Sequence, residues 1–354
     1  MNNWPSPASR QLVSILGRGL RSIPFVSEAA IADILDPIAL VAEIAKAFES
    51  AHPEELVAPS RAHIALSEDT TLLVMPCREI RTGGLGTKLV VAPNQPDSRK
   101  RSLDAFYLMF DPETGNLKAL LSANLLTDLR TAATSALATT LLAREGSKVL
   151  GVFGTGRQAR AHILMMNWIH SFERILVCGS GQAKSEYCAS EMQREYGLRI
   201  EPSDMNTCIS EADVVCACTS SPSPLFDGHF LREGMHLNLV GAFRPDTREV
   251  DTEAIRRSQV FVESYGVSSE AGELRIPIEE GVITSAHVIS DLHELLTKRR
   301  IGRSSHADIT IFKSVGNALE DFAAVRLIER AFGSKPVSVD RDSGKYLSVQ
   351  DGKE

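Results

Sequence analysis

The chain has 354 residues, of which 43% are hydrophobic and 23% charged, with a formal net charge of −7. This composition is that of a globular protein, the length predicts two domains, and the acidic balance argues against nucleic acid as the main partner. No apolar run approaches the roughly 20 residues that span a bilayer, and no long apolar segment follows the N-terminal arginines, so neither a membrane span nor a secretory signal is expected.

The first half of the chain is predicted to be a helix followed by a strand-rich stretch. Residues 1–35 are weakly patterned, and Asp36-Pro37 then forms an N-cap with proline at the first helical position. Short apolar segments bounded by turn residues predict strands at His63–Leu66, Thr71–Met75, Thr87–Val91, Ala105–Phe110 and Leu117–Ser122. A helix rich in Ala and Leu is predicted from about Leu125 to Arg144.

From Lys148 the pattern changes to alternating strands and helices, which predicts a mostly parallel sheet covered on both faces. The strands are predicted at Val149–Phe153, Arg174–Cys178, Val214–Thr219, His236–Val240 and Val260–Glu263, and the helices begin near Arg157, Lys184 and Thr252. A last amphipathic helix is predicted over Gly316–Phe332.

The six cysteines show no C-x-x-C spacing, and Cys216 and Cys218 alternate within a strand, so they share one face. We expect small buried thiols in a reducing, cytoplasmic compartment rather than a metal site or a disulfide.

The segment from Val149 to Ala159 ends a predicted strand and opens a helix, with the pattern Gly154-Thr-Gly156-Arg-Gln-Ala159. Gly154 allows a tight turn, Gly156 lets the backbone approach a pyrophosphate, and Ala159 permits close helix–strand packing. The helix N-terminus offers free N–H groups to phosphate. The strand–turn–helix context predicts a dinucleotide site, and a glycine turn of another α/β protein is the alternative.

The end of the second strand of the alternating region bears on the choice between NAD and NADP. Cys178, Gly179 and Ser180 include no acid that would bind the adenine ribose of NAD. Ser180 and Lys184 can instead meet the additional phosphate, which favours NADP. In the alternative interpretation Lys184 is a solvated helix charge, and NAD remains open.

Two cations stand in unusual surroundings. Three glycines precede Lys88, which opens an apolar strand, and Arg130 lies in the middle of the Ala-rich helix. A cation among small and apolar neighbours needs a partner. That partner is an internal acid such as Asp128 or a substrate carboxylate, and the sequence leaves both open.

Five motifs occur in order along the chain: Gly86-Thr-Lys88, Phe110-Asp-Pro-Glu-Thr-Gly115, Leu126-Thr-Asp-Leu-Arg-Thr-Ala-Ala133, Gly154-Thr-Gly-Arg-Gln-Ala159 and Phe312-Lys-Ser-Val-Gly316. Together they resemble the ornithine cyclodeaminase/mu-crystallin family from about residue 26 to 333. The resemblance implies an α/β homodimer with a substrate-binding and dimerisation domain of the α+β class, formed by 1–128 with 321–354, and a Rossmann domain over 129–320.

The resemblance also implies site residues. It places Arg61, Lys88 and Arg130 around a substrate carboxylate, which agrees with the ability of arginine to bind a carboxylate through two hydrogen bonds. It implies cofactor contacts from Ser102, Thr131, Gly154, Thr155, Gly156, Arg157, Gln158, Thr219, Ser314 and Val315.

One departure from the family bears on the reaction. Members that cyclise ornithine carry a catalytic Asp at the position of Phe243, and phenylalanine cannot accept a proton. Asp246 lies three residues on, in a register that matches the mu-crystallin pattern.

The sequence therefore predicts an NAD(P)H-dependent reductase of cyclic ketimine acids, such as pyrroline-2-carboxylate or piperideine-2-carboxylate. The alternatives are an amino-acid or N-alkyl amino-acid dehydrogenase, an ornithine cyclodeaminase, which Phe243 disfavours, and a non-catalytic protein that binds NADPH and a small carboxylate.

Overall fold

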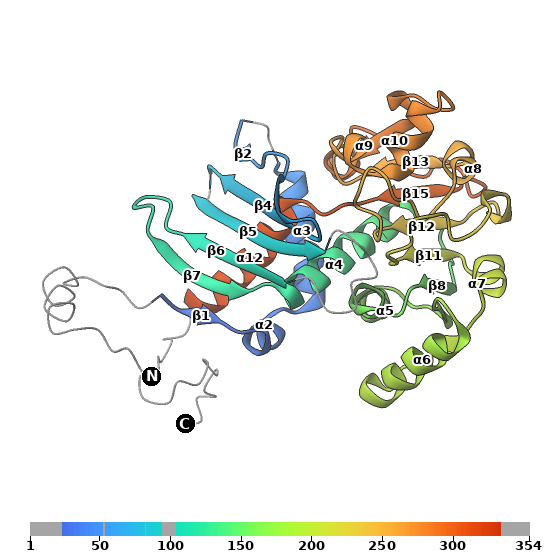
Figure 1. Cartoon of the computed structure of the whole chain (residues 1–354), viewed down its shortest axis with the longest axis horizontal. Helices are drawn as coiled ribbons and strands as arrows, with labels where there is room; N and C mark the ends of the chain where they lie inside the picture. The colour runs from blue at the N-terminus through green and yellow to red at the C-terminus, as the bar shows by residue number, and fades with distance from the viewer. Residues whose placement is uncertain (1–22, 52–53, 82, 94–103, 334–354) are drawn as a thin grey trace, which may run out of the picture.

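The computed structural model describes residues 23–51, 54–81, 83–93 and 104–333, which form two β-sheets connected and covered by helices (Figure 1). Within these ranges no helix combines the length and the apolar character needed to cross a membrane.

The first sheet has the strand order β1-β7-β6-β5-β4-β2, with β3 also paired to β4. Its strands are β1 (Phe25–Val26), β2 (Leu56–Val57), β3 (Ala62–Ser67), β4 (Thr70–Glu79), β5 (Gly84–Pro93), β6 (Asp104–Phe110) and β7 (Leu117–Ser122). All neighbours are antiparallel except β1 and β7. The five predicted strands are confirmed as β3 to β7, whereas two-residue strands such as β1 and β2 carry no periodicity to predict them.

The helices described in this half are α2 (Glu28–Ile34), α3 (Pro37–Glu49) and α12 (Ala318–Gly333). The predicted N-cap of α3 is confirmed, because Asp36 accepts a 2.7 Å hydrogen bond from the amide of Ala39. Helix α12 packs on β4 and β5, and α3 packs on α12 (Figure 1). Helix α12 begins two residues later than predicted, after Gly316 has turned the chain with φ +87°.

The second sheet is parallel throughout, with the order β10-β9-β8-β11-β12-β15-β13-β14. Its strands are β8 (Val149–Phe153), β9 (Arg174–Cys178), β10 (Glu201–Pro202), β11 (Val214–Ala217), β12 (His236–Leu239), β13 (Gln259–Val262), β14 (Val288–Asp291) and β15 (Thr310–Lys313). The five predicted strands are confirmed, within one or two residues, as β8, β9, β11, β12 and β13. Strand β15 was not predicted; it inserts between β12 and β13 although it is the last strand in sequence among the described residues.

Helices cover both faces of this sheet, as the alternating pattern predicted. Helices α4 (Asn124–Leu142), α5 (Arg157–Ile169) and α6 (Gln182–Tyr196) pack on one face, and α7 (Met205–Glu211), α8 (Thr252–Arg257) and α10 (Gly272–Glu279) pack on the other. Two shorter helices, α9 (Val267–Glu270) and α11 (Leu292–Leu296), complete this half. The predicted α/β fold with a Rossmann-type half is confirmed. All six cysteines are buried free thiols, and Cys216 and Cys218 share one face as predicted.

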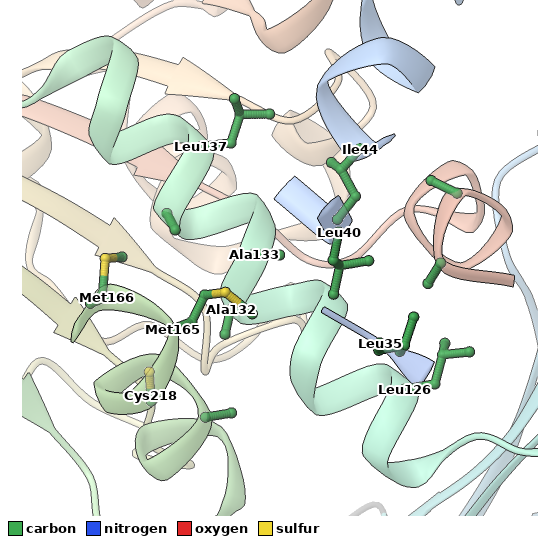
Figure 2. Close-up of a cluster of buried hydrophobic side chains, with 14 of the residues drawn as sticks. Leu35, Leu40, Ile44, Leu126, Ala132, Ala133, Leu137, Met165, Met166 and Cys218 are labelled. Atoms are coloured by element: carbon green, nitrogen blue, oxygen red, sulfur yellow. The ribbon is translucent and has the colours of Figure 1, made fainter. Parts of the chain in front are cut away.

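Helix α4 connects the two halves. Its small side chains let it pack closely between α3 and α5: Ala133 lies toward Leu40, and Ala132 lies toward Met165, while Leu126 lies beside Leu35 (Figure 2). The domain division predicted at 128/129 and 320/321 falls within α4 and α12, so each helix is shared between the two parts of that division.

Candidate active site

A cleft of about 1120 Å³ lies between the inner face of the first sheet and the carboxyl ends of the parallel strands. In open parallel sheets this edge is where ligands bind, near the point where the strand order reverses. Its lining includes three sets of predicted residues: Arg61, Lys88 and Arg130; Gly154, Thr155, Gly156, Arg157 and Gln158; and Thr131, Ser180, Thr219 and Val315.

The turn between β8 and α5 has the geometry of a phosphate cradle. Gly154 adopts φ +111°, and a Cβ there would lie 2.5 Å from the carbonyl oxygen of Cys218, so only glycine fits. A Cβ on Gly156 would face open space in the cleft. Gly156 caps α5 without a side chain, which leaves the first N–H groups of the helix open to an anionic ligand. Ala159 is fully buried beneath the turn.

The end of β9 presents a basic, hydroxylated corner to the same cleft. The Nζ atom of Lys184 donates a 2.9 Å hydrogen bond to Oγ of Ser180, and both residues line the cleft with Gly179. A phosphate at this corner would meet one ammonium and one hydroxyl group.

The ends of β11 and β12 are held together by Glu249, which the sequence analysis did not identify. Its Oε1 accepts from the amide and hydroxyl of Thr219 at 2.6 and 2.7 Å, and its Oε2 accepts from the amide of Gly241 at 2.7 Å. Glu249 is fully buried, and no sequence pattern around it signals this role.

Phe243 follows this junction and lines the cleft, so an apolar ring stands at the position where the family resemblance predicts a catalytic Asp in ornithine-cyclising members. Asp246 is an exposed residue that forms a 3.0 Å ion pair with Arg244, and it is not among the residues that line the cleft.

The cations converge on the cleft from three elements. Lys88 lies on β5, opposite Met75 of β4 and Tyr107 of β6. Arg130 lies on α4, and Arg61 precedes β3. Arg61 donates from Nη2 to the carbonyl oxygen of Gly316 at 2.8 Å and pairs with Glu270 at 3.1 Å.

Internal acids partner both Lys88 and Arg130. Nζ of Lys88 and Nε of Arg130 donate to the same oxygen, Oδ1 of Asp321, at 2.7 and 2.8 Å, and Nη1 of Arg130 binds Oε2 of Glu320. Asp128, the acid named from the sequence, is not the partner of Arg130. It binds Arg157 and Gln158 instead, because it points along α4 toward the start of α5.

Burial and neighbouring charges change the pKa values of these cations in opposite directions. Burial lowers the pKa of Lys88 to about 8, with a further lowering by Arg130 that Asp321 only partly offsets. Burial also disfavours charge on Arg130, but the carboxylates Asp321 and Glu320 outweigh it and raise the pKa of the guanidinium above its usual value. Arg130 is therefore a permanent cation, whereas Lys88 can lose its proton slightly above neutral pH.

The remaining predicted cofactor residues differ in position. Thr131 lines the cleft, and its hydroxyl donates to the carbonyl oxygen of Thr127 at 2.7 Å. Val315 lines the cleft, whereas Ser314 is buried and donates to Glu263. Ser102 lies outside the described residues.

Sequence reasoning missed the apolar wall of the cleft and its supporting acids. The wall consists of alternate residues of β4 and β5: Leu73, Met75, Val90 and Ala92. Glu320 and Asp321 resemble solvated charges in the first turn of a helix, but they stand between Leu319 and Phe322, and that interruption of an apolar run was the available signal.

Comparisons with known proteins extend over nearly the whole chain. A profile of the ornithine cyclodeaminase/mu-crystallin family matches residues 26–335. A Delta(1)-pyrroline-2-carboxylate reductase of Bacillus cereus is 31% identical over 306 residues, covering 84% of this chain and 94% of the relative. The ketimine reductase mu-crystallin of Mus musculus is 32% identical over 264 residues, covering 74% and 80% of the two chains. The solved structure of Thermococcus litoralis Delta(1)-pyrroline-2-carboxylate reductase in complex with NADH and L-proline has a TM-score of 0.84 and 30% identity, covering 88% of this chain and 98% of that one.

Proposed function

The chain belongs to the ornithine cyclodeaminase/mu-crystallin family, and we propose that it is an NAD(P)H-dependent reductase of cyclic ketimine acids. The family resemblance read from the five ordered motifs is confirmed. The observation that carries the proposal is a single cleft that joins a dinucleotide turn at Gly154–Gly156 to three cations, Arg61, Lys88 and Arg130.

The cofactor is a nicotinamide dinucleotide, because the uncapped N-terminus of α5 and the bare Gly156 fit its pyrophosphate. We propose that Thr155, Arg157, Gln158, Thr131, Thr219 and Val315 contribute to its binding. Ser180 and Lys184 support NADP over NAD, since they offer a hydroxyl and an ammonium group where the additional phosphate of NADP lies in Rossmann domains.

The substrate is a small cyclic imine that carries a carboxylate, such as a five- or six-membered ring. The cations Arg61, Lys88 and Arg130 bind its carboxylate, and the apolar wall formed by β4 and β5 contacts its ring carbons. We call these three cations, Arg61, Lys88 and Arg130, the clamp. The clamp holds the C=N bond over the cofactor site, so that the bound substrate is already oriented for reaction. Phe243 extends the apolar surface, which suits a ring better than a charged diamine chain.

The reduction adds a hydride to the imine carbon and a proton to the imine nitrogen, giving the cyclic secondary amine. The reduced cofactor, when bound, supplies the hydride. Lys88 is the proton source within the clamp, because its pKa of about 8 keeps its ammonium mostly charged at neutral pH yet able to release a proton.

We propose that the protein is a cytoplasmic homodimer. The outer face of the first sheet presents an apolar surface of partly exposed side chains: Leu72, Val74, Leu89, Val91, Phe106 and Leu108. A second copy of the chain can cover this face by symmetry, which removes the apolar side chains from water. The buried free thiols suit a reducing compartment.

The test is the oxidation of NADPH and NADH, followed optically, in the presence of pyrroline-2-carboxylate and piperideine-2-carboxylate. We expect turnover with at least one ring and none with ammonia plus pyruvate. Turnover only with a primary amine donor would identify an amino-acid dehydrogenase, and cofactor binding without turnover would identify a binding protein.

A further inference from the structure

The first turn of α12 carries two adjacent acids, Glu320 and Asp321, that are fully buried behind the cleft. Asp321 accepts from both Lys88 and Arg130 through one oxygen, and Glu320 accepts from Arg130. Burying a charge is costly unless it is paired and hydrogen-bonded, so each acid must either have enough partners or be neutral.

Glu263 is a second acid that interacts with Glu320. It follows β13 and accepts three hydrogen bonds: from the Ser314 hydroxyl at 2.5 Å and from the amides of Val315 and Gly316 at 3.2 and 3.1 Å. These donors reach both carboxyl oxygens of Glu263. Through them Glu263 holds the 314–316 segment, part of which lines the cleft.

One oxygen of each acid on α12 lacks a hydrogen-bond donor. Among the described residues, Oε1 of Glu320 and Oδ2 of Asp321 are both buried without a donor, but Asp321 accepts from two cations through its other oxygen, whereas Glu320 lies within hydrogen-bonding range of a further carboxyl group, that of Glu263. Two buried carboxyl groups in such contact share a proton, because the repulsion between two carboxylates is weakly screened there. Burial and the acids Glu263 and Asp321 raise the pKa of Glu320 well above its ordinary value, although Arg130 opposes them.

We propose that Glu320 and Asp321 are positioning residues in opposite charge states: Asp321 is the ionised acid that holds Lys88 and Arg130, and Glu320 is a neutral acid that links Arg130 to Glu263. With the Arg61–Glu270 pair included, the site otherwise opposes four carboxylates to three cations, and an anionic substrate would meet a net negative charge. A neutral Glu320 removes that excess and leaves the clamp able to accept a carboxylate.

Isosteric amides at the two positions test this assignment. Glu320→Ala is expected to lower kcat/KM for a ketimine at least tenfold, and Glu320→Gln to recover most of that loss, because its amide accepts from Arg130 and donates to Glu263 as the neutral acid does. Asp321→Asn is expected to recover little of the loss caused by Asp321→Ala. The Asp321→Asn variant should also show its alkaline fall of kcat/KM at lower pH than wild type. The Asp321 carboxylate raises the pKa of Lys88, so its loss lowers that pKa. Glu329→Gln, in the exposed part of α12 and paired with Lys118, is the matched control.

These kinetic readouts rest on the proposed reductase function, so infrared spectroscopy supplies an independent one. Wild type at neutral pH should show the band of a protonated buried carboxyl group that Glu320→Gln lacks, whatever substrate the protein uses. If Asp321→Asn fails to fold while Glu320→Gln folds, the same assignment is supported. Replacing the ionised Asp321 by a neutral amide leaves two buried cations without a counter-charge, whereas replacing a neutral Glu320 removes no charge. The proposal is overturned if the two amides behave alike or if Glu320→Gln leaves the carboxyl band intact. If wild type shows this carboxyl band but does not reduce ketimines, the proposed reductase function is contradicted and the charge assignment of Glu320 is not.

Discussion

The ammonium group of Lys88 on β5 donates a 2.7 Å hydrogen bond to Oδ1 of Asp321 on α12, across 233 residues of sequence. Both side chains are almost fully buried, with exposed fractions of 1% and 0%. The contact attaches α12 to the sheet that carries the apolar wall of the cleft. It also fixes the position of a cation whose pKa lies near neutral pH.

The pH dependence of ketimine reduction is expected to follow the titration of Lys88. Because its pKa is lowered to about 8, the ammonium form predominates below that pH and is lost as the pH rises through it, so kcat/KM should fall on that alkaline limb. Lys88→Arg keeps a charge at all these pH values and should remove the limb while lowering kcat. Titration of the substrate imine affects both enzymes equally, so identical profiles would show that Lys88 does not titrate in the reaction.

Arg130→Met is expected to lower kcat/KM at least tenfold while changing NADPH affinity little. A charge-assisted hydrogen bond contributes roughly 1.5–3 kcal/mol, which is about tenfold or more in kcat/KM. The melting temperature should also fall, because Glu320 and Asp321 lose a buried partner. Lys118→Met removes an exposed ion pair and serves as the control. Wild-type kinetics in a folded Arg130→Met variant would show that Arg130 is purely structural.

Ornithine is expected to be a poor substrate. Cyclodeamination needs a base to deprotonate an amine of ornithine, and Phe243 supplies none at the position that lines the cleft. With NAD and ornithine the protein should release no ammonia while it still reduces a cyclic ketimine. Formation of ammonia and proline at a rate comparable to imine reduction would show that the protein is an ornithine cyclodeaminase. Asp246 or another acid would then be the base.

The preference for the cofactor is expected to depend on Lys184. NADPH should bind at least as tightly as NADH, and Lys184→Gln should weaken NADPH binding several-fold with little effect on NADH, because only the phosphate of NADPH needs the ammonium. Fluorescence titration of both cofactors measures this. Wild type that prefers NADH more than tenfold, or a variant that loses affinity for both cofactors equally, would contradict the assignment.

The oligomeric state is expected to depend on the outer face of the first sheet. Phe106 lies at the centre of this face, opposite Leu89 on the neighbouring strand, and is 38% exposed. Phe106→Asp places a charge in the proposed interface and should convert a dimer into a monomer in light-scattering measurements. Tyr187→Asp, at an exposed aromatic side chain on α6, is the control. A monomeric wild type would contradict the proposal.

The sequence by itself determined the features that depend on neighbouring residues. The turn at Gly154–Gly156, the cap at Asp36 and the strands β3 to β7 follow from backbone freedom, capping chemistry and local periodicity, which are visible within a few residues. The five ordered motifs likewise indicate the family without reference to any tertiary contact.

Only the tertiary structure decided which groups compensate the cations. The partners of Arg130 lie 190 and 191 residues away, so the nearby Asp128 was the natural candidate from sequence although it binds Arg157 and Gln158. The insertion of β15 between β12 and β13 brings the 314–316 segment and α12 back to the cleft. The roles of buried acids such as Glu249 and Glu320 depend on the hydrogen-bond partners that surround them after folding. These partners come from distant strands and helices, so no local sequence pattern predicts them.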